Sequence, residues 1–183
     1  MSNLNDIQLS VFGPAEAADQ LDVVSELYVD VFFPPPHNKG QLELGRMRGA
    51  WPRRLKAPGF RLVVADSEGS PAGCVYGHQL AANTGWWAGA VDPLPDDVAN
   101  EQEGRTVAII DMLVREQWRR CGLAEAMHDT LLADRTEQRV TLLVKPDNTP
   151  ARRAYEKWGY QQVGRIQPFP DAPVFDSMVK NLR

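Results

Sequence analysis

The sequence contains few of the residues that cross-link small domains or bind structural metals. Of its 183 residues, two are cysteines and three are histidines. Cys74 and Cys121 lie far apart, in no Cys-x-x-Cys spacing and beside no histidine cluster. Neither a disulfide framework nor a metal site is therefore expected.

A long apolar segment is also missing. No apolar run approaches the roughly 20 residues that a helix needs to cross a bilayer. The opening stretch, MSNLNDIQLS, lacks the basic start and the apolar core of a secretory signal peptide. These absences predict a cytoplasmic location and no membrane partner.

The chain has no excess of positive charge. Lysine and arginine number 20 against 24 aspartates and glutamates, a net charge of −4, so nucleic acid is not an expected partner. Basic residues gather locally at Arg115–Arg120 and Arg152–Arg153, next to two expected helix starts, which suits a small phosphorylated ligand. The acidic segment Asp92–Glu103 either is a solvated loop or attracts a cationic substrate.

What is present is the composition of one soluble domain covering residues 1–183, with 43% hydrophobic and 24% charged residues and no repeat. Periodicity and turn residues predict helices, strands and one long loop. The predicted helices cover residues 15–32, 41–55 (interrupted or ended near Pro52), 123–135 and 151–158. The predicted strands cover residues 60–66, 72–80, 106–114, 139–144, 160–166 and 173–182, and the loop covers 81–104. This order predicts an α/β fold around one mixed sheet flanked by helices.

The stretch RRCGLAEA, Arg119–Ala126, combines a basic pair, a glycine and small residues at an expected helix start. A glycine lets the backbone approach a ligand, and a helix N-terminus presents N–H groups without helical partners. The stretch therefore fits an anion site, although a flexible helix start with a solvated basic pair explains it equally well. The surrounding sequence has to decide.

Two segments together resemble the GNAT superfamily of acyl-CoA-dependent N-acyltransferases. LVREQWRRCGLA resembles the strand-to-helix segment that ends in Arg/Gln-x-x-Gly-x-Gly/Ala, and VKPDNTPARRAYEKWGY resembles the second family segment. The resemblance implies a single, mostly antiparallel central sheet and an N-acetyltransferase that transfers an acetyl group from acetyl-CoA to a primary amine by direct attack. Glu116 and Arg120 depart from the family pattern, where a proline and a glycine are common.

The same resemblance implies the residues that hold acetyl-CoA, with no metal. The loop before the helix would bind the pyrophosphate through backbone N–H groups. The preceding strand would pair with the pantetheine arm, and the N–H of Val114 would polarise the thioester carbonyl. Asn148 would cap the next helix and contact the cofactor. The implied cofactor-binding residues are Met112, Leu113, Val114, Arg119, Arg120, Cys121, Gly122, Leu123, Ala124 and Asn148.

Two residues are candidates for proton transfer. By resemblance, Tyr155 would protonate the departing thiolate; the alternative is that it packs on the buried face of its helix. Asp111 is the only acid inside the apolar run 106–114, which makes it a candidate general base or substrate contact. A structural hydrogen bond is the alternative for Asp111, and water is a competing route for the proton.

The acceptor is expected to be a cationic small molecule. His37, Trp86 and Trp87 are candidate substrate contacts, although the tryptophans could equally anchor the long loop. His78 and His128 are expected to be structural, with His128 exposed or half-buried. A homodimer, a protein N-terminal or lysine acetyltransferase, and a non-catalytic coenzyme A-binding module are alternatives left open.

Overall fold

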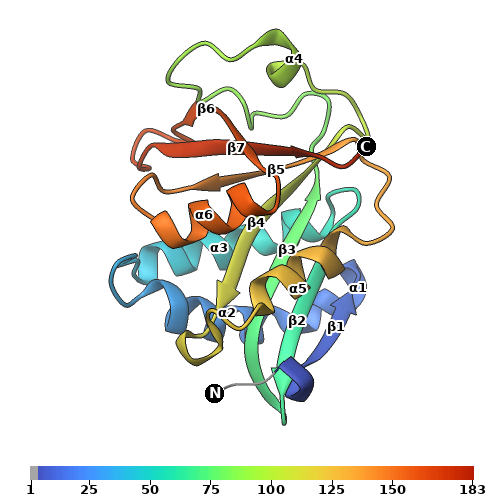
Figure 1. Ribbon diagram of the computed structural model, residues 1–183, viewed down its shortest axis with the longest axis vertical. Coiled ribbons are helices and arrows are strands. Elements are labelled where there is room, and N and C mark those ends of the chain that lie inside the picture. The colour runs from blue at the N-terminus through green and yellow to red at the C-terminus, as the bar shows by residue number, and fades with distance from the viewer. Residues whose placement is uncertain (1–3) are drawn as a thin grey trace. The chain divides into compact units, whose positions relative to one another are not determined.

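The computed structural model describes residues 4–183, which form a seven-stranded sheet with the strand order β1-β2-β3-β4-β5-β7-β6 and with flanking helices (Figure 1). Pairing is antiparallel for β1–β2, β2–β3, β5–β7 and β6–β7 and parallel for β4–β5. The predicted α/β class with a mixed, mostly antiparallel central sheet is confirmed. The chain divides into two compact units. Unit 1 runs to His78 and resumes at Asp111–Arg135, and unit 2 comprises Gln79–Ile110 and Thr136–Arg183.

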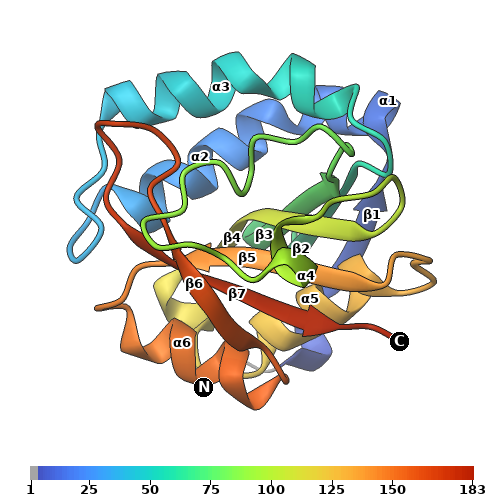
Figure 2. The ribbon, with the colours of Figure 1, turned by 90° about the horizontal axis from the view of Figure 1, so that it is seen from above.

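Unit 1 contains the N-terminal strands and the helices on either side of them. Figure 2 shows α2 and α3 on one side of β2 and β3, with α5 on the other. Its elements are the short helices η1 (Leu4–Asp6), α1 (Pro14–Ala17), η2 (Ala18–Gln20) and η3 (Glu116–Trp118), the helices α2 (Leu21–Phe32), α3 (Gln41–Leu55) and α5 (Leu123–Leu132), and the strands β1 (Gln8–Phe12), β2 (Arg61–Ser67) and β3 (Ser70–Gln79).

The core of unit 1 is built around an aromatic cluster. Trp51 of α3 is almost fully buried, and its ring meets the rings of Phe60 and Tyr76 edge-on at 5.6 and 5.1 Å. Its indole N–H donates to the backbone oxygen of Ala17 at 3.3 Å. This packing explains why α3 continues through Pro52 to Leu55, where an interruption was predicted, because burying Trp51 offsets the helical hydrogen bond that proline cannot make.

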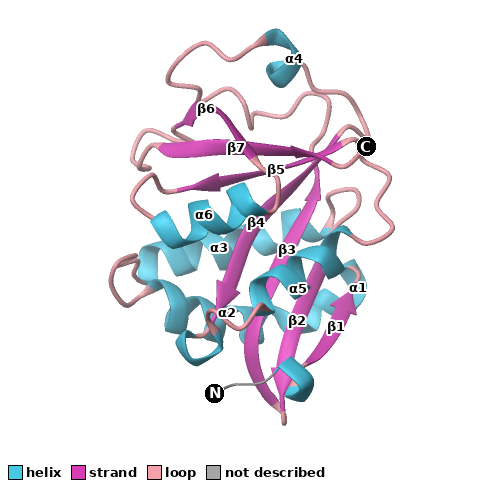
Figure 3. Ribbon diagram, viewed as in Figure 1, coloured by secondary structure: helices cyan, strands magenta, loops and turns pink. Residues whose placement is uncertain are grey.

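Unit 2 contains the C-terminal strands, the helix α6 and the long loop. Its elements are α4 (Asp96–Ala99), β5 (Arg139–Val144), α6 (Thr149–Lys157), β6 (Gln161–Ile166) and β7 (Phe175–Asn181). Within this unit, α6 lies on one side of β6 and β7, and the loop before β4 lies on the other (Figure 2). Figure 3 shows this loop as coil interrupted by the short α4.

Strand β4 (Thr106–Val114) starts in unit 2 and ends in unit 1. Its described ladder with the parallel β5 covers three residue pairs, from Thr106 and Arg139 to Ala108 and Thr141, although β4 runs on to Val114. The first half of β4 therefore carries the pairing with β5. The second half, which starts at Asp111, extends past that ladder.

Three sequence predictions need correction. Strand β1 was not predicted, because QLSVF is short and alternates weakly, and antiparallel pairing with β2 sets its conformation. Helix α5 ends at Leu132 rather than at Arg135, since Ala133 leaves the helical conformation with a ψ of 137° and Asp134 has a positive φ of 58°. His128 is fully buried rather than exposed or half-buried, and its Nδ1 lies 2.9 Å from Oδ1 of Asp129.

The long loop of unit 2 is held by a buried arginine. The guanidinium of Arg139 donates to the Thr106 hydroxyl at 2.7 Å and to the Val98 carbonyl at 2.8 Å. It also pairs with the Glu101 carboxylate at 3.3 Å, and the Trp87 ring lies 5.2 Å from its Cζ. Burial lowers the pKa of Arg139, an effect that the Glu101 carboxylate opposes. Glu101 in turn accepts hydrogen bonds from Trp87 and Thr106, so the loop is tied to the sheet of unit 2.

Replacing Arg139 with Met should lower the free energy of unfolding by about 3–5 kcal/mol, because Glu101 would keep a buried charge without its cationic partner. Arg165→Met is the matched control, since Arg165 pairs with Asp92 on the surface of the same unit. The free energy of unfolding of Arg165→Met should fall by less than about 1 kcal/mol. Urea denaturation measures both, and equal losses for the two variants would show that the buried ion pair has no special role.

Candidate functional site

The loop between β4 and α5, residues 119–124, has the geometry of an anion site and is called the cradle below. Gly122 is the N-cap of α5 in the left-handed conformation, with φ of 89°, and Arg120 also has a positive φ of 61°. The first helical hydrogen bond runs from Ala126 N–H to the Gly122 carbonyl at 3.0 Å. In such a helix start, the earlier N–H groups of the first turn have no helical acceptor and can bind an anion.

The space beside Gly122 is open. A Cβ built there would have Cδ1 of Leu4 as its nearest neighbour, at 3.4 Å, which is ordinary van der Waals contact. Glycine is therefore required at this position by the backbone conformation, which side chains disfavour. Arg119, Arg120 and Gly122 are all exposed, so a ligand can reach the cradle from solvent.

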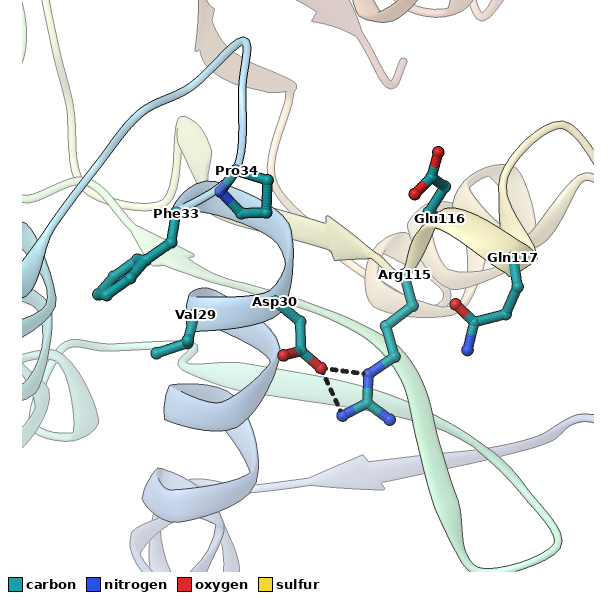
Figure 4. A pocket seen from close by; sticks show the side chains of 7 residues that line it. All are labelled: Val29, Asp30, Phe33, Pro34, Arg115, Glu116 and Gln117. Atoms are coloured by element: carbon teal, nitrogen blue, oxygen red, sulfur yellow. Dashed lines mark hydrogen bonds and ion pairs between the residues drawn. The ribbon is translucent and has the colours of Figure 1, made fainter.

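Arg115 does not belong to the cradle, although it is part of the predicted basic cluster. Figure 4 shows its guanidinium pointing toward Asp30 of α2, with Nη2 2.8 Å from the carboxylate. It also pairs with Glu26 and donates to the Pro71 carbonyl at 2.7 Å. Arg115 therefore ties the end of β4 to α2 and to the start of β3. Within the predicted basic cluster, the candidates for binding an anion are then Arg119 and Arg120.

A pocket of about 480 Å³ opens next to this ion pair (Figure 4). Residues from the end of α2 line one side, and residues that follow β4 line the other. The lining residues are Val29, Asp30, Phe33, Pro34, Arg115, Glu116 and Gln117. The pocket combines apolar side chains with paired charges, and it lies within unit 1.

Asp111 on β4 accepts a short hydrogen bond from the phenol of Tyr76 on β3. The same phenol oxygen accepts a hydrogen bond from the Arg54 guanidinium at 2.9 Å. Tyr76 is fully buried, and burial together with the Asp111 charge holds its pKa well above the ordinary value. Tyr76 therefore stays a neutral hydrogen-bond donor. The two hydrogen bonds, from Arg54 to Tyr76 and from Tyr76 to Asp111, fix the carboxylate on β4.

The strands are close together at this point. A Cβ added to Gly73 of β3 would lie 2.5 Å from the Leu113 carbonyl oxygen, so only glycine fits there. The thiol of Cys74 is fully buried, and burial raises its pKa, with a further contribution from Asp111. Asp111 itself is only half-buried.

Beyond Asp111, the connection between α2 and α3 contains His37, the predicted acceptor contact. Its ring meets the Phe32 ring edge-on at 5.0 Å. Burial raises the pKa of Tyr28 on α2, and the negative charges of Asp111 and Glu43 raise it further.

Asn148 caps α6, as predicted, because its Oδ1 accepts the Ala151 N–H at 3.4 Å. Tyr155 lies on the same helix, with its ring centroid 5.6 Å from Trp158 and 5.7 Å from Tyr160. These contacts account for the packing interpretation of Tyr155 and leave its acid role a prediction. Arg152 pairs with the buried Asp176 at 2.7 Å and so has a structural partner.

The two tryptophans of the long loop differ in their surroundings. Trp87 is buried against a core cluster of Leu80, Val98, Ala108 and Ile166, and its indole N–H donates to Glu101 at 3.1 Å. The half-buried Trp86 packs against the same cluster, and its indole nitrogen has no hydrogen-bond partner within the described chain. Both contacts support the loop-anchor interpretation.

Residues 4–183 contain no group of three or more His, Cys, Asp or Glu side chains that could hold a metal ion. Within the same residues, no helix combines the length and apolar character that crossing a membrane requires.

Comparison with known proteins identifies the family. The model of the acetyltransferase (GNAT) family matches residues 21–160, which include the cradle, Asp111 and Tyr155. The chain therefore belongs to the GNAT acetyltransferase family, and this membership supports an acyltransferase activity. No curated protein matches the sequence.

Solved structures of low sequence identity share the fold over nearly the whole chain. PH1933 from Pyrococcus horikoshii OT3 is 16% identical with a TM-score of 0.66, covering 97% of this chain and 99% of its own. A putative GNAT acetyltransferase from Desulfovibrio desulfuricans is 15% identical with a TM-score of 0.64, covering 97% and 98%. The PaiA N-acetyltransferase from Thermoplasma acidophilum, solved with coenzyme A, is 8% identical with a TM-score of 0.60, covering 99% of each chain.

Tyr76 and Arg54 were not predicted as site residues. Tyr76 reads as an ordinary aromatic residue in a strand, and Arg54 reads as a basic residue in the last turn of a helix. Neither type of position signals a function. Only the pairing of strands and the packing of α3 reveal their contacts with Asp111.

Proposed function

We propose that this chain is an N-acetyltransferase that transfers the acetyl group of acetyl-CoA to a primary amine by direct attack. The observation that carries the proposal is the cradle, in which a left-handed glycine opens a helix N-terminus beside two exposed arginines. A pyrophosphate fits these groups because the helix dipole, the N–H groups and the guanidinium groups all favour negative charge. Family membership supports the same ligand.

The proposed cofactor path follows β4 into the cradle. Met112, Leu113 and Val114 offer their backbone groups to the pantetheine arm, and Arg119 to Ala124 hold the pyrophosphate. The Val114 N–H stabilises the negative charge that develops on the thioester oxygen. Asn148, at the start of α6, adds a hydrogen bond to the cofactor. This path is supported by the pairing of β4, because its described ladder with β5 ends at Ala108, well before Val114.

In the proposed reaction, the amine nitrogen attacks the thioester carbonyl carbon and the carbon–sulfur bond breaks. Asp111 takes the proton that the amine must lose, either directly or through water. Tyr155 donates a proton to the departing thiolate, giving free coenzyme A. Support for Asp111 comes from Tyr76 and Arg54, which fix its carboxylate in one orientation.

The proposed acceptor is a cationic small molecule. We further propose that residues 1–183 act as one domain and that the enzyme is soluble and works in the cytoplasm. His37 is the proposed acceptor contact of the α2–α3 connection, whereas the packing of Trp86 and Trp87 favours a role in anchoring the loop. The rival candidate is a module that binds coenzyme A without turnover. Release of free thiol from acetyl-CoA with a panel of amines separates the two, since the module would release none.

Replacing Gly122 with Val should reduce coenzyme A affinity at least about tenfold, because the cradle requires a positive φ that a β-branched residue disfavours. Calorimetry measures the affinity. Gly69→Val is the matched control, because Gly69 has a similar φ of 83° in the β2–β3 turn, with no atom within 4 Å of an added Cβ. The control should share the backbone strain and keep the affinity. Equal affinity in the two variants would exclude the cradle as the pyrophosphate site.

Replacing Asp111 with Asn should slow transfer about tenfold or more near neutral pH, where the amine is protonated and a base is needed. The loss should shrink as the pH rises toward the amine pKa of about 10, because the acceptor then loses its proton unaided. A pH–rate profile tests this, with Asp66→Asn as the control, since the Asp66 carboxylate accepts the Gly69 N–H in a turn. A profile that keeps its shape and is merely scaled down would assign Asp111 a positional role.

Replacing Tyr155 with Phe should lower kcat at least about tenfold, because proton donation contributes roughly 10²–10⁴-fold and water can substitute in part. Acetyl-CoA binding should hardly change, since the ring contacts remain. Tyr160→Phe is the control, because it removes a hydroxyl from a ring only 5.7 Å away and should leave kcat unchanged. A kcat for Tyr155→Phe within twofold of the parent, with chemistry rate-limiting, would make Tyr155 a packing residue.

A further inference from the structure

The two oxygens of the Asp111 carboxylate have different surroundings. Oδ2 accepts the hydrogen bond from the Tyr76 phenol, whereas Oδ1 accepts no hydrogen bond within residues 4–183. Among the same residues, the buried side-chain polar atoms without a partner belong to Trp86 and Ser177. Oδ1 of the half-buried Asp111 is therefore open to solvent. A general base needs such an open oxygen, because the proton that it takes must be able to reach it.

Tyr76 closes the route through the other oxygen, because its hydroxyl group is used on both sides. The O–H donates to Oδ2 of Asp111, and the phenol oxygen accepts the Arg54 N–H at 2.9 Å. A proton that arrived at Oδ2 could pass no further than Tyr76, since a guanidinium group neither accepts a proton nor loses one in proteins. A proton taken from an amine must therefore enter and leave Asp111 through Oδ1.

The core of unit 1 holds these two hydrogen bonds in place. Tyr76 is fully buried, and its ring centroid lies 5.1 Å from that of Trp51 and 6.4 Å from that of Phe60. The Arg54 guanidinium carbon lies 5.5 Å from the centroid of the Tyr76 ring. Because the ring is packed on several sides, the phenol oxygen stays beside Asp111, and the carboxylate cannot turn without losing its hydrogen bond.

The other ionisable groups that respond to the charge of Asp111 are neutral near neutral pH. Burial raises the pKa of the Cys74 thiol and the Tyr76 phenol on β3 and of the Tyr28 phenol on α2, and the negative charge of Asp111 raises each of these pKa values further. These three groups keep their protons and so cannot take one from an amine. Within this set, the Asp111 carboxylate can.

We propose that Asp111 acts as a one-sided base, in which Oδ1 takes the proton of the acceptor amine while the positioning residues Tyr76 and Arg54 hold Oδ2. This inference rests on the proposed function, because a base is needed only if an amine is acetylated. The amine N–H bond breaks, its electron pair stays on nitrogen and forms the bond to the acetyl carbonyl carbon, and Oδ1 then passes the proton to solvent water. Neither positioning residue touches the acceptor, so both act on kcat through Asp111.

Tyr76→Phe releases Oδ2 and should lower kcat about tenfold or more near neutral pH, because a small displacement of a catalytic group can cost about 10²-fold. The KM for the amine and the affinity for coenzyme A should not change, since Tyr76 is fully buried. The loss should shrink as the pH approaches the amine pKa of about 10, where the acceptor loses its proton unaided. It should not exceed the loss in Asp111→Asn, because Tyr76 acts through that carboxylate.

Combining Tyr76→Phe with Asp111→Asn distinguishes positioning from packing. Once residue 111 no longer takes the proton, removing the phenol hydroxyl should cause no further loss of kcat. Two independent effects would instead multiply, and the double variant would be slower than Asp111→Asn alone.

Arg54 variants test the same hydrogen bonds with the Tyr76 ring intact, and they remain informative if Tyr76→Phe fails to fold. Arg54→Met removes one hydrogen bond to the phenol and should lower kcat about three- to tenfold. Arg54→Lys should keep kcat within about threefold of the parent, because one N–H serves the phenol and an ammonium group can supply it. Arg53→Met is the matched control, since the exposed Arg53 lies in the same last turn of α3, and it should leave kcat unchanged.

The release of free thiol from acetyl-CoA, followed across pH with one good amine acceptor, measures all of these variants. If the parent acetylates no amine, the proposed function and this inference are both wrong. If the parent is active and neither Tyr76→Phe nor Arg54→Met changes kcat, the proposed reaction stands and the one-sided base is overturned. A Tyr76→Phe profile that is merely scaled down, or a further loss in the double variant, also overturns it. A loss of kcat that shrinks at high pH, with KM unchanged and no further loss in the double variant, supports it.

Discussion

The hydrogen bond from Tyr76 to Asp111 connects the packing of unit 1 to its chemistry. Tyr76 is buried in the aromatic cluster around Trp51, so the orientation of its phenol is set by the hydrophobic core. The Asp111 carboxylate takes its orientation from that phenol, and Arg54 supplies a positive charge behind it. A half-buried carboxylate in a strand is costly unless it has partners, and here a core aromatic residue supplies them.

The arginines of this chain differ in how completely the protein surrounds them. Arg115 and Arg139 are surrounded by acceptors, and each ties a strand of the sheet to a neighbouring segment. Arg119 and Arg120, beside Gly122, are exposed at the start of α5, and Arg119 donates one hydrogen bond, to the Val114 carbonyl at 3.2 Å. The planar guanidinium suits both uses, because its five donors can satisfy several carbonyls or a phosphate.

The sequence predicted the elements whose signals are local. Strands β4 and β5 were placed at their observed ends, because apolar runs and turn residues mark those ends. The Gly122 turn and the Asn148 cap were also predicted, since each depends on a single residue type. Strand β1, the buried His128 and the contacts of Asp111 with Tyr76 were not. Each of these depends on a partner distant in the sequence, which no local pattern reports.

Besides Arg139, Arg105 also anchors the long loop, since its guanidinium donates to the carbonyls of Asp97 and Asn100. This anchoring has a consequence for how the protein can change. These guanidinium groups donate hydrogen bonds to the backbone carbonyls of Asp97 and Asn100. These hydrogen bonds therefore do not depend on which side chains occupy those two positions. The loop can therefore accumulate substitutions there while keeping its path. Replacing Arg139 with lysine keeps the positive charge. It would nevertheless leave several hydrogen-bond acceptors without a donor, because an ammonium group cannot reproduce the planar donor geometry of a guanidinium. Positions 97 and 100 should thus tolerate substitution because their backbone carbonyls, and not their side chains, are recognised.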